Sequence, residues 1–341
     1  MMLQRFFSLL LAFALSFLFC GGLFAAKRNT MTCDWCGRKI SSNASFLRSE
    51  DKNFCSEKCF KAYAESLLPV CDVCGRRFKE GYTSEGKNYC SKACLETTFH
   101  ECCHCHRREP KGYIIGEDLF LCMYCRELPA CASCQMPLDK FSKELGDGRG
   151  ICRECARDAV FSQSGMNSLM KEIRRQLADK FKMSTDHEIE YDLCNRSELK
   201  KESESDGENE LGLFVFNRHT VTFFNRTIRS KDEFRILILT GLAPEFFRGV
   251  AAHELAHDWM QENLPHIDDP QMREGFAEFV AWAYAKSEDL KRVPWRMEQN
   301  TDEIYGGGFR KVRDLMGDAR TASEWKKILL KACPAPAGAQ K

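Results

Sequence analysis

Two histidines four residues apart give the clearest sign of chemistry in the sequence. Residues 253 to 257 read HELAH, so a glutamate, Glu254, directly follows the first histidine. Residues at this spacing project from one face of a helix, and His253 and His257 can therefore bind one metal ion. From the neighbouring position Glu254 can reach a water molecule on that ion. Catalytic zinc uses three protein ligands plus water, so one more ligand must come from elsewhere in the chain.

The third ligand is expected on a second helix. The segment REGFAEFVAWAYA places Glu274 and Glu278 one turn apart, and 16 residues separate Glu274 from His257. This spacing resembles that of gluzincins, which complete the zinc site with a glutamate from a following helix. We therefore assign Glu274 as the ligand and Glu278 as a carboxylate that orients a ligating histidine. Gly275 is expected to let the two helices approach closely.

An HExxH motif also occurs by chance on amphipathic helices that carry surface histidines. Here apolar residues surround the motif, and a second helix with two glutamates follows at a suitable distance. Burial of two histidines and two glutamates without a metal ion would be unfavourable. The whole constellation therefore favours a metal site.

The elements that must position these residues indicate an α+β domain, of zincin-like metallopeptidase type, over residues 160–332. A helix is expected near its start, with an apolar face formed by Met166, Leu169, Ile173, Leu177 and Phe181. Four short strands are then expected at HEIEYDL, LGLFVF, HTVTFFNR and FRILILTGL. The HELAH helix should open at Pro244, and the second helix at Asp269 and Pro270.

Two further segments of this domain carry expectations. Residues 198 to 210 hold six acidic and two basic residues and predict a solvated loop. The run ILILTGL ends shortly before the HELAH helix and predicts an edge strand on which an extended peptide could lie.

Sixteen of the 20 cysteines form eight close pairs, which group into four modules. Module one is Cys33, Cys36, Cys55 and Cys59, module two is Cys71, Cys74, Cys90 and Cys94, module three is Cys102, Cys105, Cys122 and Cys125, and module four is Cys131, Cys134, Cys152 and Cys155. Inside the modules the two pairs are 18, 15, 16 and 17 residues apart. The first two modules also share sequence, so they are expected to be internal repeats.

This spacing favours zinc over disulfide bonds. Two close pairs of thiolates complete a zinc tetrahedron, and a glycine after each of the first two CxxC pairs suits the reversal of chain direction there. Disulfide bonds are the alternative for an exported chain, but disulfide frameworks rarely place nearly every cysteine in close pairs at a fixed repeat. Four thiolates leave no open coordination position, so we predict about four structural zinc ions beside one catalytic ion.

The module array also limits the class of partner. Modules three and four, residues 102 to 155, resemble a divergent LIM pair of treble-clef type, with a spacer longer than usual and without the usual histidine ligand. In module three, Cys103, His104 and His106 are rival ligands. No stripe of basic and aromatic residues accompanies the array, so we expect contact with a protein partner and no nucleic acid.

The net charge and the N-terminal segment indicate which partners and which cellular location to expect. Lysine and arginine number 50 and aspartate and glutamate 49, so the net charge of +1 gives no reason to expect an acidic partner. Arg5 is followed by 21 uncharged residues, Phe6 to Ala26. Residues 1–26 therefore predict a signal peptide, with a retained membrane anchor as the alternative. We expect an exported protein, periplasmic or secreted, that meets a membrane only if this segment is retained.

Several segments occur in the order found in one known family. They are CCHCHRREPKGYIIGEDLFLCMYC, DGRGICRECARDAVFSQSGMNSLMKEIRRQLADKF, YDLCNRSEL, RILILTGLAPEFFRGVAAHELAHDWM and REGFAEFVAWAY. Through them the chain resembles the plant LIM-domain peptidases of the DA-one family and their bacterial relatives. The resemblance implies a zinc-dependent endopeptidase acting on protein substrates. It also implies His253, His257 and Glu274 as zinc ligands and Glu254 as the catalytic glutamate.

The chain departs from this family in two respects. The family tends to have glutamine where this chain has Glu278, which favours Glu274 as the ligand. No segment looks like a ubiquitin-interacting helix, so activation by ubiquitin is not carried over.

We expect metal-assisted hydrolysis of a peptide bond. Glu254 takes the proton of the attacking water and later delivers it to the leaving amine. A further donor must stabilise the oxyanion, and Tyr284, Tyr305 and His266 are candidates between which the sequence does not choose. The alternatives are a non-enzymatic zinc-binding LIM-like scaffold and a metalloenzyme with a non-peptide substrate.

Overall fold

The computed structural model describes residues 31–335 except residues 42, 117, 204–209 and 224–225. The chain divides into two compact units, Met1–Tyr113 and Ile114–Lys341. The predicted signal segment, residues 1–26, lies outside the described residues. Within the described ranges no helix is both long enough and apolar enough to cross a membrane.

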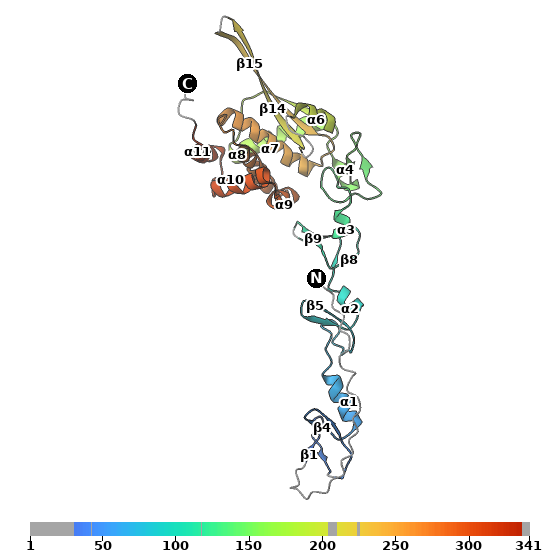
Figure 1. Cartoon of the computed structure of the whole chain (residues 1–341). Coiled ribbons are helices and arrows are strands. Elements are labelled where there is room, and N and C mark those ends of the chain that lie inside the picture. The colour runs from blue at the N-terminus through green and yellow to red at the C-terminus, as the bar shows by residue number, and fades with distance from the viewer. Residues whose placement is uncertain (1–30, 42, 117, 204–209, 224–225, 336–341) are drawn as a thin grey trace. The chain divides into compact units, whose positions relative to one another are not determined.

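The first unit consists of small modules built from hairpins and a helix. Its elements are β1 (Met31–Thr32), β2 (Lys39–Ile40), β3 (Leu47–Ser49), β4 (Lys52–Phe54), α1 (Glu57–Ser66), β5 (Tyr82–Ser84), β6 (Lys87–Tyr89), α2 (Lys92–Glu96), β7 (His100–Glu101) and β8 (Arg108–Glu109). In module one, β1 pairs with β2 and β3 with β4 before α1 begins (Figure 1). In module two, a single bridge between Val70 and Arg77 takes the place of the first hairpin. The two modules therefore follow the same order of elements, as their shared sequence predicted.

The second unit carries the HELAH segment. Its elements are β9 (Gly112–Ile115, which contains the unit boundary), β10 (Leu119–Cys122), α3 (Met123–Arg126), β11 (Lys143–Glu144), β12 (Gly150–Ile151), α4 (Arg153–Asp158), α5 (Gln163–Phe181), β13 (Ile189–Cys194), α6 (Arg196–Glu202), β14 (Gly212–Phe223), β15 (Arg226–Leu239), α7 (Pro244–Asn263), α8 (Pro270–Ser287), α9 (Arg292–Gln299), the π-helix η1 (Glu303–Gly307), α10 (Gly308–Met316) and α11 (Ala322–Ala332). The α+β class expected from the sequence is thus confirmed.

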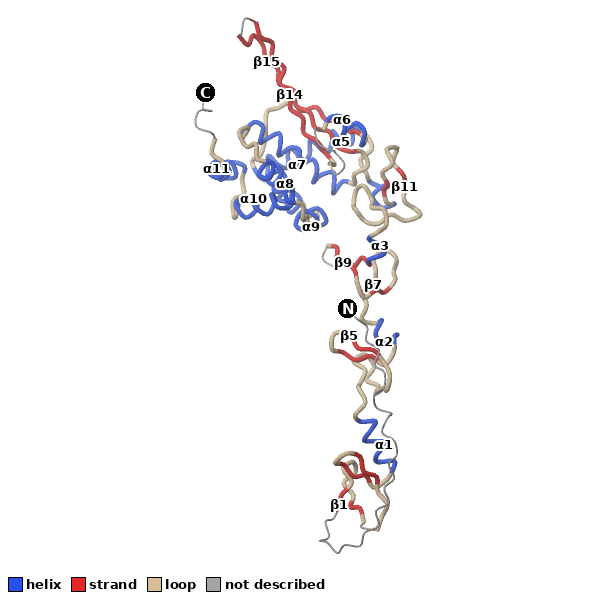
Figure 2. Tube along the Cα trace, in the orientation of Figure 1, coloured by secondary structure: helices blue, strands red, loops and turns tan. Residues whose placement is uncertain are grey.

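The three helices expected from the sequence all form. The helix α5 buries Met166, Met170, Ile173 and Leu177 along one face. The helix α7 begins at Pro244, and Asp269 caps α8 through a hydrogen bond from the backbone N–H of Gln271. The helices α7, α8 and α10 lie together beside the strands in Figure 2, and they share one apolar core with α5.

One three-stranded sheet, in the order β13–β15–β14, lies next to these helices. The strand β13 is parallel to β15, and β14 is antiparallel to β15 with Gly212 opposite Ile238. The segments LGLFVF and HTVTFFNR were expected as two strands, but the single strand β14 (Gly212–Phe223) runs through most of both. Exposed residues 217–220 follow the half-buried residues 211–216, so the polar stretch marks where the strand leaves the core and not where it ends.

The prediction that the run ILILTGL forms an edge strand is wrong. The run FRILIL is the last part of β15, which is the middle strand, and β14 lies at the edge among the described residues. Residues Ile236 to Leu239 are all buried, because both faces of β15 are covered. A continuous apolar run is typical of such a central strand.

The prediction that residues 198 to 210 form a solvated loop is wrong for the first part of this segment. Residues Arg196–Glu202 form α6, because Asn195 and Glu198 make a capping box in which each side chain accepts from the other's backbone N–H. Residues 204–209 lie outside the described residues.

Module four is packed into the second unit. Its buried residues share a cluster with residues that precede or belong to α7, α8 and α9: Cys131, Cys134, Ile151, Cys155, Ala243, Phe246, Ala285 and Val293. The fully buried Ser133 accepts a hydrogen bond at Oγ from the N–H of Ala243 (2.9 Å) and one at its carbonyl from Arg296 (3.2 Å). Module four therefore folds against the helices that carry the HELAH segment.

Candidate metal centre

Three predicted ligand atoms meet between α7 and α8. His253 Nε2 and His257 Nε2 are 3.1 Å apart, and Glu274 Oε2 lies 3.2 Å from the first and 3.4 Å from the second. Ligands of a tetrahedral zinc ion at 2.0–2.1 Å are separated by about 3.3 Å. The donor set and its spacing therefore fit a zinc ion, and these three residues are the ones that could hold it.

Glu278 lies one helical turn beyond Glu274, behind the first histidine. Its Oε1 is 3.3 Å from His253 Nδ1, the ring nitrogen on the far side from the ligand group. A carboxylate at this nitrogen fixes the ring orientation and the tautomer that leaves Nε2 available to a metal. The Nδ1 of His257 is buried and has no hydrogen-bond partner among the described residues, so the two histidines are supported differently.

Burial and opposite charge together set the protonation of this group. Burial would lower the pKa of His253, but the carboxylates of Glu274 and Glu278 outweigh it and raise that pKa well above its usual value. Burial would raise the pKa of Glu274, but the two histidines hold it far below its usual value. Burial lowers the pKa of His257. Glu274 is thus kept ionised and His257 neutral, which are the forms that bind a metal, whereas His253 keeps a proton that a metal ion would displace.

Glu254 is buried beside the ligands and is not one of them. Only 5% of its surface is exposed, and burial raises its pKa to about 7, helped by the negative charges of Glu274 and Glu210. The charge of His253 opposes the rise, and so does the N–H of Phe214 in β14, which donates a hydrogen bond to Glu254. A carboxyl group with a pKa near 7 is suited to take up and release a proton at neutral pH.

The edge strand β14 passes directly against Glu254. A Cβ atom at Gly212 would lie 2.7 Å from Glu254 Oε1, so a larger residue at this position would displace the Glu254 side chain. The first residues of β14 therefore border the place where Glu254 would act.

Of the three oxyanion candidates, Tyr305 lies at the site. Its ring is stacked toward that of His253 with a centroid distance of 6.4 Å, and burial together with the charges of nearby glutamates raises its pKa. The hydroxyl of Tyr284 donates instead to Gln176 (2.7 Å). His266 Nε2 lies 3.0 Å from the carbonyl oxygen of Cys333. Tyr305 sits in the π-helix η1, an element often found at functional sites.

Gly275 has a different role from the one expected. A Cβ atom there would lie 2.4 Å from the backbone of Gly308, and one at Gly308 would lie 2.3 Å from Gln271 O. The close approach is therefore between α8 and the start of α10, and not between α7 and α8. It holds η1, and with it Tyr305, against the helix that supplies Glu274.

Asp258 is a residue that the sequence reasoning missed. It follows the ligand His257, is only 1% exposed, and accepts a hydrogen bond from Thr185 Oγ1. Its Oδ1 also lies 2.7 Å from His187 Nδ1, and the His187 ring stacks on Phe234 at 3.7 Å. Asp258 therefore ties α7 to the segment before β13 and to β15. An aspartate between the ligand His257 and the apolar Trp259 was the available signal.

The four cysteine modules come together as predicted. In each, the four sulfur atoms lie within 4.8 Å of one another. In modules one, two and four, neighbouring sulfurs are 3.5 to 3.8 Å apart, for example 3.6 Å between Cys36 and Cys55 and 3.8 Å between Cys134 and Cys152. A disulfide bond is about 2.05 Å long, whereas sulfurs on a tetrahedral zinc at 2.3 Å are about 3.8 Å apart. The spacing fits zinc and not disulfide bonds.

The CxxC turns share one backbone conformation. The residue after the second cysteine has a positive φ in all four modules, and these residues are Gly37 (73°), Gly75 (71°), His106 (58°) and Gln135 (62°). In each, its N–H donates to the carbonyl of the first cysteine at 2.9 Å. Glycine adopts this conformation without strain, as the sequence suggested for the first two modules, and the last two use other residues.

Backbone donors lower the pKa of the first cysteine in modules one and two, whereas neighbouring thiols raise the pKa of Cys55 and of Cys90 to about 12. Burial would raise the pKa of Cys33, but N–H groups of Cys36, Cys55 and Trp35 lower it to about 6. The same arrangement lowers the pKa of Cys71 to about 6. The rival ligands of module three, Cys103, His104 and His106, are not part of its four-sulfur group.

Known plant proteins resemble this chain, although no family model matches it. It is 27% identical over 273 residues to "Protein DA1-related 1" of Arabidopsis thaliana, covering 69% of this chain and 47% of that protein. It is 27% identical over 188 residues to "LIM domain-containing protein HDR3" of Oryza sativa subsp. japonica, covering 48% and 37%. It is 23% identical over 333 residues to "Protein DA1" of Arabidopsis thaliana, covering 75% and 59%.

The chain therefore spans between 37% and 59% of the length of these relatives. As its sequence led us to expect, the chain is a homologue, over most of its length, of the LIM-domain proteins of the DA1 and DA1-related family.

Proposed function

We propose that this protein is a zinc-dependent endopeptidase that hydrolyses peptide bonds in protein substrates. The observation that carries the proposal is the meeting of His253, His257 and Glu274 at 3.1 to 3.4 Å beside the buried Glu254. The similarity to the DA1 family supports the same reaction.

Each residue of the group has a separate task. His253, His257 and Glu274 would hold a zinc ion, which when bound supplies Lewis-acid activation of water and of the peptide carbonyl. Glu254, buried beside the ligands, accepts the proton of the attacking water and passes it to the leaving amine. The hydroxyl of Tyr305 donates a hydrogen bond to the developing oxyanion.

The edge strand β14 is the surface on which we place the substrate. It borders Glu254 at Gly212 and Phe214, and among the described residues it pairs only with β15. An extended peptide that adds to this edge gains backbone hydrogen bonds irrespective of its sequence. Such binding brings a backbone carbonyl close to the group of ligands, as an endopeptidase requires.

The variant Glu254→Gln tests the proposal. Glutamine has nearly the same shape but cannot carry the proton, so kcat on casein should fall about 10²- to 10⁴-fold or more. Zinc content, measured by elemental analysis, should stay at the wild-type value because Glu254 is not a ligand. Cleavage at the wild-type rate by this variant would refute the mechanism.

The same experiment also tests the alternative that the protein is a non-enzymatic zinc-binding scaffold. A non-enzymatic scaffold would cleave neither casein nor other unfolded proteins, even with its zinc in place. A buried glutamate that is not a ligand has no use in such a scaffold, because an apolar residue at this position would be more stable. This observation favours the enzyme.

A further inference from the structure

A pocket of about 800 Å³ lies in the second unit, where module four meets the start of β14. Its wall includes Arg149 from module four, Arg196 at the start of α6, Leu211 directly before β14, and Arg296 from α9. We call it the arginine pocket. The reaction described above does not use these arginines.

Basic side chains outnumber acidic ones in the pocket wall. The charged residues that line it are Lys143, Arg149, Arg196, Arg296, Asp139 and Glu144. The carboxylate of Asp139 is engaged in its own loop, where it accepts hydrogen bonds from Phe141 N and Ser142 Oγ. The wall therefore carries a surplus of positive charge, which attracts an anionic group.

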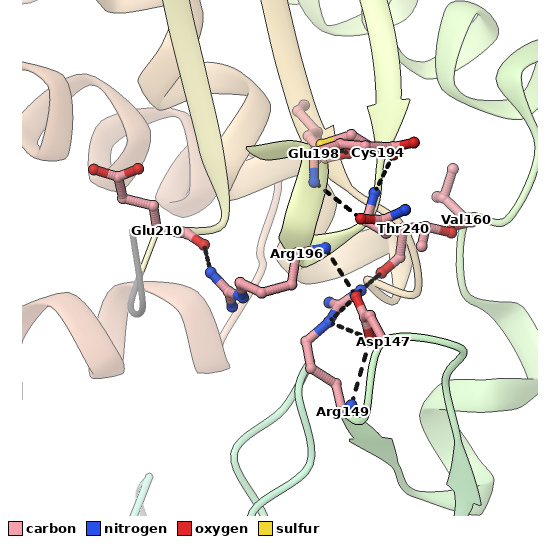
Figure 3. Close-up of polar contacts among 10 residues, drawn as sticks. Asp147, Arg149, Val160, Cys194, Arg196, Glu198, Glu210 and Thr240 are labelled. Atoms are coloured by element: carbon pink, nitrogen blue, oxygen red, sulfur yellow. Dashed lines mark hydrogen bonds and ion pairs between the residues drawn. The ribbon is translucent and has the colours of Figure 1, made fainter. Parts of the chain in front are cut away.

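Arg149 is fixed in place but retains an unused donor. Its Nη2 lies 2.8 Å from Asp147 Oδ2 and donates to the carbonyl of Thr240 at 3.0 Å (Figure 3). Only 11% of the side chain is exposed, and its Nη1 has no hydrogen-bond partner among the described residues. A buried donor without a partner is unfavourable, so a ligand that accepts from it would be stabilised.

Arg196 and Arg296 are held by backbone carbonyls. Arg196 donates from Nη1 to the carbonyl of Glu210 at 2.6 Å, and its backbone N–H donates to Asp147, as Figure 3 shows. Burial lowers the pKa of Arg196, and the neighbouring charge of Arg149 lowers it further. Burial likewise lowers the pKa of Arg296. Both shifts mean that nearby positive charge and lost hydration are not fully offset, so an incoming anion would relieve them.

The pocket adjoins the metal centre. Leu211 in its wall is followed by Gly212, which lies against Glu254. Arg296 is also close enough to Glu278, the carboxylate behind His253, for their charges to interact. A polypeptide bound at the metal centre can therefore reach the pocket within a few residues.

The direction of β14 indicates which part of the substrate would enter the arginine pocket. The chain runs from Leu211 at the pocket into β14 and along Glu254. A peptide that pairs antiparallel with β14 runs the opposite way, so the residues after the cleaved bond approach Leu211. The pocket would then face the C-terminal side of the cleaved bond.

We propose that the arginine pocket binds a carboxylate of the polypeptide substrate, on the C-terminal side of the cleaved bond. This inference rests on the proposed endopeptidase function and adds a specificity for acidic substrates. The carboxylate comes from an aspartate or glutamate side chain or from the substrate's own C-terminus. Arginine recognises both through the same paired hydrogen bonds.

Peptides that differ at one position test the proposal. A series carries glutamate or glutamine at each of the positions around the cleaved bond, with a free or an amidated C-terminus. Wild type should cleave the peptide with glutamate after the bond about 10- to 100-fold faster in kcat/KM than its glutamine twin. If amidation, rather than the change to glutamine, removes the advantage, the bound group is the C-terminal carboxylate.

Substitutions in the pocket should change this preference. Arg196→Gln should lower kcat/KM on the glutamate peptide by about 10- to 100-fold, and Arg196→Glu should favour a lysine peptide over the glutamate peptide. A reversal of preference cannot come from misfolding. Arg320→Gln, at a side chain that is 80% exposed on another part of the unit, is the matched control and should behave as wild type.

Binding to the Glu254→Gln protein separates this inference from the proposed function. If that protein binds the glutamate peptide more tightly than the glutamine peptide and Arg196→Gln removes the difference, the pocket stands even if wild type cleaves nothing. Equal binding and equal cleavage of the two peptides would overturn the inference while leaving the peptidase intact. A preference located before the cleaved bond would also overturn it.

Discussion

At the scale of single residues, the structure separates Glu274 from Glu278. Only Glu274 reaches both histidine Nε2 atoms, whereas Glu278 lies at His253 Nδ1. We predict that Glu274→Gln empties the catalytic zinc site, because two histidines bind zinc weakly. Glu278→Gln should keep the ion and lose about 10- to 100-fold in zinc affinity or activity. Elemental analysis with activity assays on both variants checks this, and the reverse order would move the ligand role to Glu278.

Tyr305 carries the second prediction at this scale. The variant Tyr305→Phe removes the hydroxyl but keeps the ring beside His253, so kcat should fall about 10²- to 10³-fold with zinc retained. Tyr284→Phe is the matched control. Its hydroxyl bonds to Gln176 and Arg248 away from the site, so it should keep kcat and lose about 1 kcal/mol of stability. Equal losses of kcat in the two variants would remove the role of Tyr305.

The sequence predicted the ligands but left Tyr305 as one of three candidates, for a physical reason. His253, His257 and Glu274 lie on two helices whose starts are marked by proline and by a capping aspartate, so their spacing specifies their geometry. Tyr305 reaches the site only because η1 and Gly308 pack on α8, a contact between segments that no local pattern records. The same holds for Asp258, whose partners Thr185 and His187 are distant in sequence.

At the scale of elements, the contact between Gly275 and Gly308 positions the site. A Cβ atom at Gly275 would lie 2.4 Å from the Gly308 backbone, so Gly275→Ala must separate α8 from η1 and α10. We expect a loss of about 1–3 kcal/mol in stability, together with a fall in kcat as Tyr305 moves away. Thermal unfolding and kinetics measure the two effects. Unchanged kcat in a destabilised variant would show that this contact does not position Tyr305.

Gly146 offers the matched control for this element prediction. A Cβ atom at Gly146 would meet no atom within 4 Å, so Gly146→Ala should change neither stability nor kcat appreciably.

The order of the strands in the sheet could be predicted from the sequence only in part. The apolar pattern located the sheet, but which strand lies at its edge depends on pairing partners, and β15 proved central because both its faces are buried.

At the scale of the whole molecule, the four cysteine modules were predictable because each is local. Two close pairs about 15 to 18 residues apart must fold onto one ion, and all four sets meet as expected. The packing of module four against Ala243 and Phe246 was not predictable, because it depends on apolar residues about 90 to 115 positions further along the chain. Module four thus contributes both to the core of the second unit and to the arginine pocket.

This packing leads to a prediction about zinc and stability. The folded chain should hold about five zinc ions, four in the modules and one at the HELAH site. The variant Cys134→Ser should lose one of them, because three thiolates and a hydroxyl bind zinc poorly. Since Cys134 shares a cluster with Phe246 of α7 and Val293 of α9, that loss should also lower the unfolding temperature of the second unit and its peptidase activity. Cys333→Ser, outside the modules, should retain all the zinc and the activity. Elemental analysis and thermal unfolding test these two expectations. A content near one zinc ion per chain, with every module cysteine oxidised, would mean that disulfide bonds replace zinc. An unfolding temperature unaffected by Cys134→Ser would mean that module four does not stabilise the second unit.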